Sequence, residues 1–201
     1  MEMRSRLLDA AARVFAETGY RGATTRRIAL EAGVNEVTLF RHFGSKAELM
    51  QAALEHFGEA APRVGLPAEP VDPERELTAW ARGNLRHLCA VRALIRAAMG
   101  ETGEHVELAA CGSEHPRRAG RQLKEYLLAL RERGLALEDF DLVSATAMLL
   151  GTLFSDAMGR DLMPDVFPRS PDQAAAAYVR LFLNAIGVRT GARSEPAGQS
   201  N

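Results

Sequence analysis

The stretch Thr24–Phe43 constrains the fold more than any other part of the chain. Its sequence, TTRRIALEAGVNEVTLFRHF, predicts two short helices joined by a tight turn. Thr25 is expected to be the first N-cap, because its hydroxyl can accept a hydrogen bond from an N–H group of the first turn. Gly33 suits the left-handed conformation that ends a helix. Asn35 can then cap the second helix.

The side chains of this stretch divide into an inward and an outward set. The apolar positions recur at helical spacing, namely Ile28, Ala29 and Ala32 in the first helix and Leu39 and Phe43 in the second. Glu36, Val37 and Arg41 are left facing outward. A helix, a glycine turn and a second helix with a polar outer face match the helix-turn-helix, whose second helix lies in the DNA major groove.

The charge distribution favours contact with DNA through one small surface. The 201-residue chain has a net charge of −1, which argues against a general polyanion binder. Residues 1–46 hold eight Arg and Lys against five acids, a net charge of +3, so the remainder carries −4. A modestly basic N-terminal segment followed by an acidic remainder is typical of a protein that binds nucleic acid through that segment.

Cysteine use and hydropathy predict a cytoplasmic protein that does not span a membrane. Cys89 and Cys111 are far apart and no signal peptide precedes them, so we expect reduced thiols. The longest uncharged apolar run, between Asp141 and Asp156, has 14 residues. A membrane span needs roughly 18 or more, so this run predicts a buried helix.

Helix start and stop signals predict an all-α chain. A first helix is expected over about 4–18 because Gly19 follows it, and Ser45 with Glu48 forms a capping box for another. The predicted domains are a helix-turn-helix domain at 1–57, a connecting segment at 58–71, a helical body at 72–187 and a disordered tail at 188–201. Within the body, helices are expected from Pro73, with Leu77, Trp80, Ala81 and Leu88 buried, then over 92–110, from Pro116, over 139–160, and from the Ser170–Gln173 capping box to Ala185.

The last two predicted helices favour self-association. A helix with one buried face shows one apolar stripe. Apolar residues instead surround most of the helices around 140–160 and 170–186, so one face can pack on the body and the other on a second copy. The alternative is that both are central core helices of a monomer. We favour a homodimer, because one helix-turn-helix contacts too few base pairs for tight operator binding.

Many residues at fixed spacing in the N-terminal segment carry a family resemblance. They are Phe15-Ala16-Glu17-Thr18-Gly19-Tyr20, Thr25, Ile28-Ala29, Ala32-Gly33-Val34, Thr38-Leu39-Phe40, His42-Phe43, Ser45-Lys46 and Leu49. Over about the first 57 residues, without a gap, the chain resembles the TetR family of bacterial transcriptional regulators. The rest matches only in being helical. The resemblance implies a TetR-like fold of about nine helices, and an Ω-like dimeric repressor that binds a palindromic operator in double-stranded DNA and is released by a small molecule.

The resemblance also implies which residues contact DNA. Thr25 and Lys46 would hold phosphates at helix N-termini, where free N–H groups favour an anion. Arg26 would reach a base edge. Phe40 stands where the family usually has Tyr, so one phosphate contact is in doubt, and Val37 stands where the family often has Gly, Ala or Pro. The predicted DNA-binding residues are Thr24, Thr25, Arg26, Asn35, Glu36, Val37, Thr38, Phe40, Arg41, His42 and Lys46.

A structural explanation competes with each of these roles. Thr25 and Ser45 can serve only as helix caps, which is compatible with phosphate binding. His42 can be a core histidine. Arg26 and Arg41 can be solvated surface charges. In the helix-turn-helix frame, DNA contact is the favoured role for both arginines.

The body contains candidates for an effector pocket but no recognisable catalytic motif. The candidate lining residues are Trp80, His87, Met99, Met148, Phe154 and Met158, which predict a largely apolar small-molecule effector, although such side chains are more often plain core. No phosphate loop, nucleophile elbow or paired-carboxylate motif is present, so neither an enzyme nor a cofactor is expected. Glu104, His105, Glu107, Cys111, Glu114 and His115 fit no standard zinc spacing, so no metal site is predicted.

These observations predict a DNA-binding transcriptional regulator, with the repressor released by an effector as the favoured form. The alternative is a DNA-binding architectural or partner-binding protein with a filled body and no effector. The two differ in whether the body holds a ligand-sized cavity.

Overall fold

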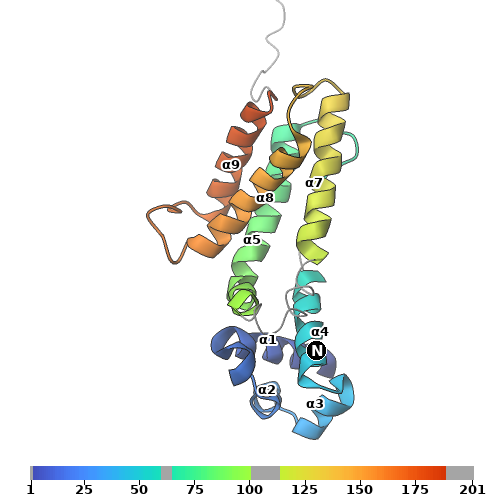
Figure 1. Cartoon of the computed structure of the whole chain (residues 1–201), viewed down its shortest axis with the longest axis vertical. Coiled ribbons are helices and arrows are strands. Elements are labelled where there is room, and N and C mark those ends of the chain that lie inside the picture. The colour runs from blue at the N-terminus through green and yellow to red at the C-terminus, as the bar shows by residue number, and fades with distance from the viewer. Residues whose placement is uncertain (1, 60–64, 101–113, 189–201) are drawn as a thin grey trace, which may run out of the picture. The chain divides into compact units, whose positions relative to one another are not determined.

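The computed structural model describes residues 2–59, 65–100 and 114–188, and this part of the chain is all helical (Figure 1). The all-α prediction is therefore confirmed. The helices are α1 (Met3–Gly22), α2 (Thr25–Ala32), α3 (Glu36–Phe43), α4 (Lys46–Glu59), α5 (Pro73–Gly100), α7 (Glu114–Glu132), α8 (Leu142–Gly159) and α9 (Pro171–Ala185).

The chain forms two compact units. Unit 1 comprises Met1–Pro62 and His87–Arg118, and unit 2 comprises Arg63–Arg86 and Ala119–Asn201. The divisions fall inside α5 and α7, so each of these helices contributes residues to both units. The predicted domains follow one another along the chain, and their boundaries stay a prediction.

Unit 1 is built on the apolar faces of its N-terminal helices. One hydrophobic cluster contains buried residues from α1 to α4, together with Leu94 and Ala98 of α5. Its fully buried members include Leu7, Phe15, Ile28, Leu39 and Leu49. Each such side chain contributes about 1.5–3 kcal/mol through burial, so this cluster holds α2 and α3 in place.

The helical geometry of α1 breaks at Gly19, where the sequence predicts an end. Gly19 has φ 67° and ψ −179°, a conformation that glycine adopts without the steric cost of a Cβ. The backbone then makes a further short turn to Gly22, and the N–H of Ala23 donates to the Gly19 carbonyl at 3.1 Å.

The predicted break near residue 91 is wrong, because α5 runs without interruption from Pro73 to Gly100. No Gly or Pro stands between Leu88 and Arg92, so nothing in the local sequence ends the helix there. The N-terminal signal is confirmed, since the Asp72 carboxylate accepts from the Arg75 N–H at 3.1 Å. Leu88 is only half-buried. The predicted residues 101–110 lie outside the described part of the chain.

Unit 2 draws its core from four helices. Fully buried side chains include Trp80 of α5, Leu127 of α7, Leu153 of α8 and Leu183 of α9. Two side-chain hydrogen bonds join α5 to α7, from Trp80 Nε1 to Gln122 Oε1 at 3.3 Å and from the Tyr126 hydroxyl to Glu76 Oε2 at 2.8 Å. Polar ends of these aromatic side chains are therefore paired.

A buried carboxylate joins α8 to α9. The Asp156 side chain is fully buried and accepts from Arg160 Nη2 at 2.5 Å and from the Tyr178 hydroxyl at 2.7 Å. Burial and this hydrogen bond raise the pKa of Tyr178 to about 12. A buried charge of this kind is tolerated only when it is paired and hydrogen-bonded, so the three residues fix the two helices together.

Both helices begin with caps close to the predicted positions. The Asp141 carboxylate accepts from the Val143 N–H at 3.0 Å, so α8 starts three residues after the predicted residue 139. The Ser170–Gln173 capping box is confirmed in both of its hydrogen bonds. Among the described helices, α8 is long and apolar enough to cross a membrane by length and composition alone, a test that core helices of soluble proteins also pass.

Candidate DNA-binding surface

The turn between α2 and α3 is a Schellman motif centred on Gly33. Gly33 has φ 65° and ψ 40°, in the left-handed region. The Gly33 N–H donates to the Leu30 carbonyl at 3.0 Å, and the Val34 N–H donates to the Ala29 carbonyl at 2.9 Å. Arg6 of α1 also donates through Nη2 to the Ala32 carbonyl at 2.5 Å. The predicted glycine turn is therefore present, and Arg6 anchors it to α1.

The first helix of the motif is capped by Thr24, so the predicted cap at Thr25 is wrong. The Thr24 hydroxyl accepts from the Arg27 N–H at 3.2 Å. Thr25 is the first helical residue, and its hydroxyl donates to Glu36 Oε1 at 2.5 Å. The Glu36 carboxylate stands in the first turn of α3, where the helix dipole favours negative charge. This bond ties the N-termini of α2 and α3 to each other.

The cap of α3 is the predicted Asn35. Its Oδ1 accepts from the Val37 N–H at 2.9 Å, and its carbonyl accepts from the Thr38 N–H at 2.9 Å. Val37 itself is 72% exposed, which is high for a β-branched apolar side chain. Leu39 and Phe43 are buried on the opposite side of α3, as predicted.

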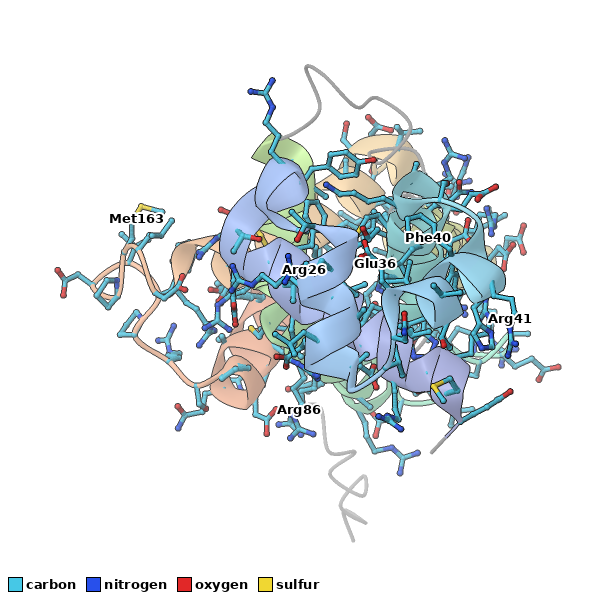
Figure 2. All side chains as sticks on the ribbon, turned by 90° about the horizontal axis from the view of Figure 1, so that it is seen from below. Arg26, Glu36, Phe40, Arg41, Arg86 and Met163 are labelled. Atoms are coloured by element: carbon cyan, nitrogen blue, oxygen red, sulfur yellow. The ribbon has the colours of Figure 1, made fainter. Side chains whose placement is uncertain are left out.

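The outward face of the motif combines cationic, apolar and acidic side chains. In Figure 2, Arg26 of α2 lies near Glu36 and Phe40 of α3, and Arg41 of α3 lies farther out, near the edge of the view. Within the described part of the chain, Arg26 and Arg41 make no side-chain hydrogen bond or ion pair, and both are exposed. Phe40 is also exposed, at 44%. Two guanidinium groups are therefore free to bind a ligand from outside.

His42 is exposed at the end of α3, so the alternative of a core histidine is wrong, and its predicted DNA contact stays a prediction. Its ring lies 6.3 Å from the ring of Phe43, measured between centroids. The guanidinium of Arg4, from α1, lies 5.4 Å from the centroid of the same Phe43 ring. Arg4 is a further candidate DNA contact. The sequence did not indicate it, because Arg4 and Phe43 are far apart in the chain and meet only in the folded unit.

Lys46 is engaged within unit 1. Its Nζ donates to the carbonyl of Tyr20 and lies 4.1 Å from the centroid of the Tyr20 ring. These contacts fix the ammonium group of Lys46 on Tyr20, and its predicted phosphate contact stays a prediction. Lys46 is half-buried, and it joins α4 to the last turn of α1, after Gly19.

The capping box predicted at the start of α4 is only half formed. The Ser45 hydroxyl accepts from the Glu48 N–H at 3.1 Å, as expected. The Glu48 carboxylate, however, accepts from the Ser45 hydroxyl at 2.9 Å rather than from the Ser45 N–H. The Ser45 N–H instead donates to the Phe43 carbonyl at 2.8 Å, because the backbone turns sharply at Gly44.

The predicted effector-pocket residues lie in different environments. Trp80 is fully buried, His87 and Met158 are half-buried, and Met99, Met148 and Phe154 are exposed. The pocket they were expected to line stays a prediction.

His87 forms a pair with His115 in unit 1. The two rings lie 4.8 Å apart between centroids, and Arg118 Nη2 lies 3.5 Å from His115 Nδ1. Burial, then His87 and Arg118, lowers the pKa of His115 to about 4. Burial, then Arg118, also lowers the pKa of His87. Both rings are therefore neutral at pH 7. Of the six potential metal ligands considered above, four (Glu104, His105, Glu107 and Cys111) lie outside the described residues.

The segment that carries this surface is similar to known bacterial regulatory proteins. The family model described as bacterial regulatory proteins, tetR family, matches residues 7–53, a range that includes all of α2 and α3. The uncharacterized HTH-type transcriptional regulator YvkB of Bacillus subtilis is 28% identical over 130 residues, 65% of this chain and 68% of YvkB. The HTH-type transcriptional repressor Rv3405c of Mycobacterium tuberculosis is 38% identical over 71 residues, which span 35% of this chain and 38% of the repressor.

A solved structure extends the similarity to the helical body. The transcriptional regulator FadR of Bacillus subtilis, determined in complex with stearoyl-CoA, has a TM-score of 0.72 to this chain at 20% identity. The match covers 92% of this chain and 99% of that one. At this identity, the similarity establishes the fold alone.

Proposed function

We propose that this chain, a DNA-binding transcriptional regulator of the TetR family, acts in the cytoplasm as a homodimeric repressor. In this proposal it binds a palindromic operator through α3 and leaves the operator when a small molecule occupies its helical body. The similarity to a named repressor of Mycobacterium tuberculosis supports repression, although the named activator FasR of Mycolicibacterium smegmatis is also similar to part of this chain.

The observation that carries the proposal is the free outward face of α2 and α3. Arg26 and Arg41 are exposed and have no acidic partner within the described residues. A guanidinium group can bind both the O6 and the N7 atom of a guanine in the major groove. Arg26 and Arg41 are therefore assigned to base edges, and Val37 to a thymine methyl group.

Other residues are assigned to the phosphate backbone. Lys46 stands at the N-terminus of α4, and Thr38 and His42 lie on α3. Phosphate contacts fix the register of a protein on DNA without reading its sequence. The hydrogen bond from Thr25 to Glu36 limits both roles. The one hydroxyl hydrogen of Thr25 points to Glu36, so it must leave that carboxylate before it can donate to a phosphate oxygen. Glu36 orients the two helices besides facing the bases.

The exposed apolar surface of unit 2 supports a dimer. On α8, Ala145, Leu149 and Leu153 are buried, whereas Val143 and Met148 are at least half exposed. On α9, Leu181 is 69% exposed beside the buried Phe182 and Leu183. Leu162, Met163 and Val166 add exposed apolar side chains in the loop between the two helices, and Met163 points outward from it (Figure 2).

Exposed apolar side chains in this number mark an interaction surface on a soluble protein. A second copy that presents the same two helices would cover them in an isologous interface. It would also place two α3 helices for the two half-sites of a palindrome. A homodimer through residues 140–160 and 170–186 therefore follows from the same surface.

The effector assignment rests on the shared fold. FadR of Bacillus subtilis has this fold and was solved with stearoyl-CoA, a molecule with a long apolar chain. That structure supports a small molecule with a large apolar part as the effector of this chain. The alternative, a DNA-binding architectural protein with no effector, has no observation of its own in its favour.

The test is selection of bound DNA from a random pool, first without and then with apolar compounds that include long-chain acyl-CoA. The proposal predicts a palindrome whose half-sites are one helical turn apart or a multiple of it, and its loss when an effector is added. An asymmetric site would overturn the dimer. A palindrome that no compound releases would favour the architectural alternative.

A further inference from the structure

A pocket of about 480 Å³ at the beginning of α9, within unit 2, is lined by three arginines. They are Arg82 of α5, Arg169 of the loop before α9, and Arg180 of α9. Asp172 and Gln173 line the same pocket, and Ala176 and Ala177 complete it. Its volume lies within the range of about 300–1,000 Å³ that small-molecule sites occupy.

The acidic group in this lining, Asp172, is already neutralised by a fourth arginine. Arg86 Nε donates to Asp172 Oδ1 at 2.7 Å, and Arg86 Nη2 donates to the other carboxylate oxygen. This bidentate pair holds the pKa of Asp172 below its usual value. Asp172 therefore stays ionised and is bound by Arg86, and its charge also acts on Arg82, although the two side chains form no direct ion pair within the described residues.

One of the three arginines, Arg180, has an acidic partner of its own. Arg180 Nε lies 3.6 Å from Glu74 Oε1. Arg82 Nε donates only to a backbone carbonyl, that of Asp172, at 3.4 Å. The Arg169 side chain has no hydrogen bond or ion pair within the described residues. At least two guanidinium groups at this pocket thus lack a carboxylate partner in the described part of the chain.

The surrounding structure holds Arg169 in place. Its carbonyl accepts from Arg160 Nη1 at 3.1 Å, and Arg160 is itself anchored on the buried Asp156. The next residue, Ser170, forms the capping box with Gln173. The backbone that carries Arg169 is therefore fixed from both sides, although its guanidinium group is exposed.

Cationic groups gathered at one pocket repel one another, and an anion between them removes that repulsion. The fork of an arginine side chain matches two oxygens of a phosphate or a carboxylate. The methyl groups of Ala176 and Ala177 offer an apolar surface to the rest of a ligand. We propose that this pocket binds a small organic anion that carries at least two negative charges, as phosphate or carboxylate groups. The site goes beyond the proposed function, because it shares no residue with the DNA-binding surface or the predicted effector pocket.

The test is calorimetric titration of the full chain with two probes, inorganic pyrophosphate and citrate, at about 0.15 M salt, where exposed charges more than about 8 Å apart are largely screened. Saturable binding of one anion per chain is expected with one or both probes. The probe that binds tighter identifies phosphate or carboxylate as the recognised group. The titration contains no DNA, so its outcome is independent of the operator.

Three variants locate the binding. Arg82→Gln and Arg169→Gln should each weaken it by about tenfold or more, because each removes a charged hydrogen-bond donor. Arg133→Gln makes the same charge change in unit 2, at a residue whose partner is Glu69 at 3.8 Å, and should leave binding within about twofold. The thermal midpoint of each unliganded variant should match that of the wild type. Absence of saturable binding with both probes, or equal loss in Arg133→Gln, would overturn the proposal.

Discussion

The turn that joins α2 to α3 gives a prediction whose size follows from the structure. Gly33 has φ +65°, and a Cβ built there would stand 3.0 Å from Arg6 Nη2. The left-handed conformation costs an alanine about 1–2 kcal/mol. The Arg6 side chain must also shift, which weakens its hydrogen bond to the Ala32 carbonyl, worth about 0.5–1.5 kcal/mol. Gly33→Ala should therefore lower the free energy of unfolding by about 1.5–3.5 kcal/mol.

The assay is urea unfolding followed by circular dichroism, with all variants at one protein concentration. Gly65→Ala is the matched control, because its added Cβ meets nothing within 4 Å, and it should change stability by less than about 0.5 kcal/mol. Gly33→Asn should cost less than Gly33→Ala, since Asn tolerates the left-handed region. If Gly33→Ala proves as mild as the Gly65 control, the argument from backbone strain at this turn is refuted.

Three further outcomes can be checked in unit 2 and unit 1. Arg160→Ala should destabilise by about 3–5 kcal/mol, because it leaves the buried Asp156 charge without its cation, whereas Tyr178→Phe should cost about 1–3 kcal/mol; urea unfolding that reverses this order contradicts the network. The pKa of His115 is lowered to about 4, so the unfolded chain takes up its proton first as the pH falls, and stability should decrease by about 1–2 kcal/mol between pH 6.5 and 4. His115→Gln should reduce that loss of stability. An unchanged dependence of stability on pH in this variant would count against His115 as its cause. If the proposed dimer forms through α9, Leu181→Asp should convert it to monomer in sedimentation velocity, and an intact dimer in this variant would exclude α9 from the interface.

The buried side of the helix-turn-helix was predictable because the apolar spacing, the glycine and the N-cap residue all indicate the same two helices. The spacing of Ile28, Leu39 and Phe43 predicts one inner face, and all three are buried. Gly33 and Asn35 have side-chain chemistry that suits a left-handed C-terminus and an N-cap, and each occupies that position.

Residue-level detail at the same site was not predictable where neighbours compete or where distant residues meet. Thr24 and Thr25 have the same side chain and can both cap a helix. The cap is the residue whose backbone is still extended where the helix begins, and that residue is Thr24. The hydrogen bond from Thr25 to Glu36 and that from Lys46 to the Tyr20 carbonyl form only after the helices pack. Long-range contacts of this kind leave no periodic signal in a single sequence.

The continuity of α5 shows a different limit of sequence reasoning. Leu88 ends a clear apolar stripe, so a second helix was expected from residue 92. A change of the buried face along a helix produces the same pattern as a break. In the structure the helix passes from unit 2 to unit 1 near His87, and each part buries its own face.

The central claim, that α3 reads DNA through Arg41, is tested most directly by Arg41→Ala. Its binding to the DNA selected by the wild type should be measured at one fixed salt concentration, beside Arg75→Ala, which removes an exposed arginine of α5. Arg41→Ala should lose about 1–3 kcal/mol of binding free energy on the selected sequence and should relax the preference at one base pair of each half-site. Arg75→Ala should bind as the wild type does. Wild-type affinity and base preference in Arg41→Ala would contradict the account.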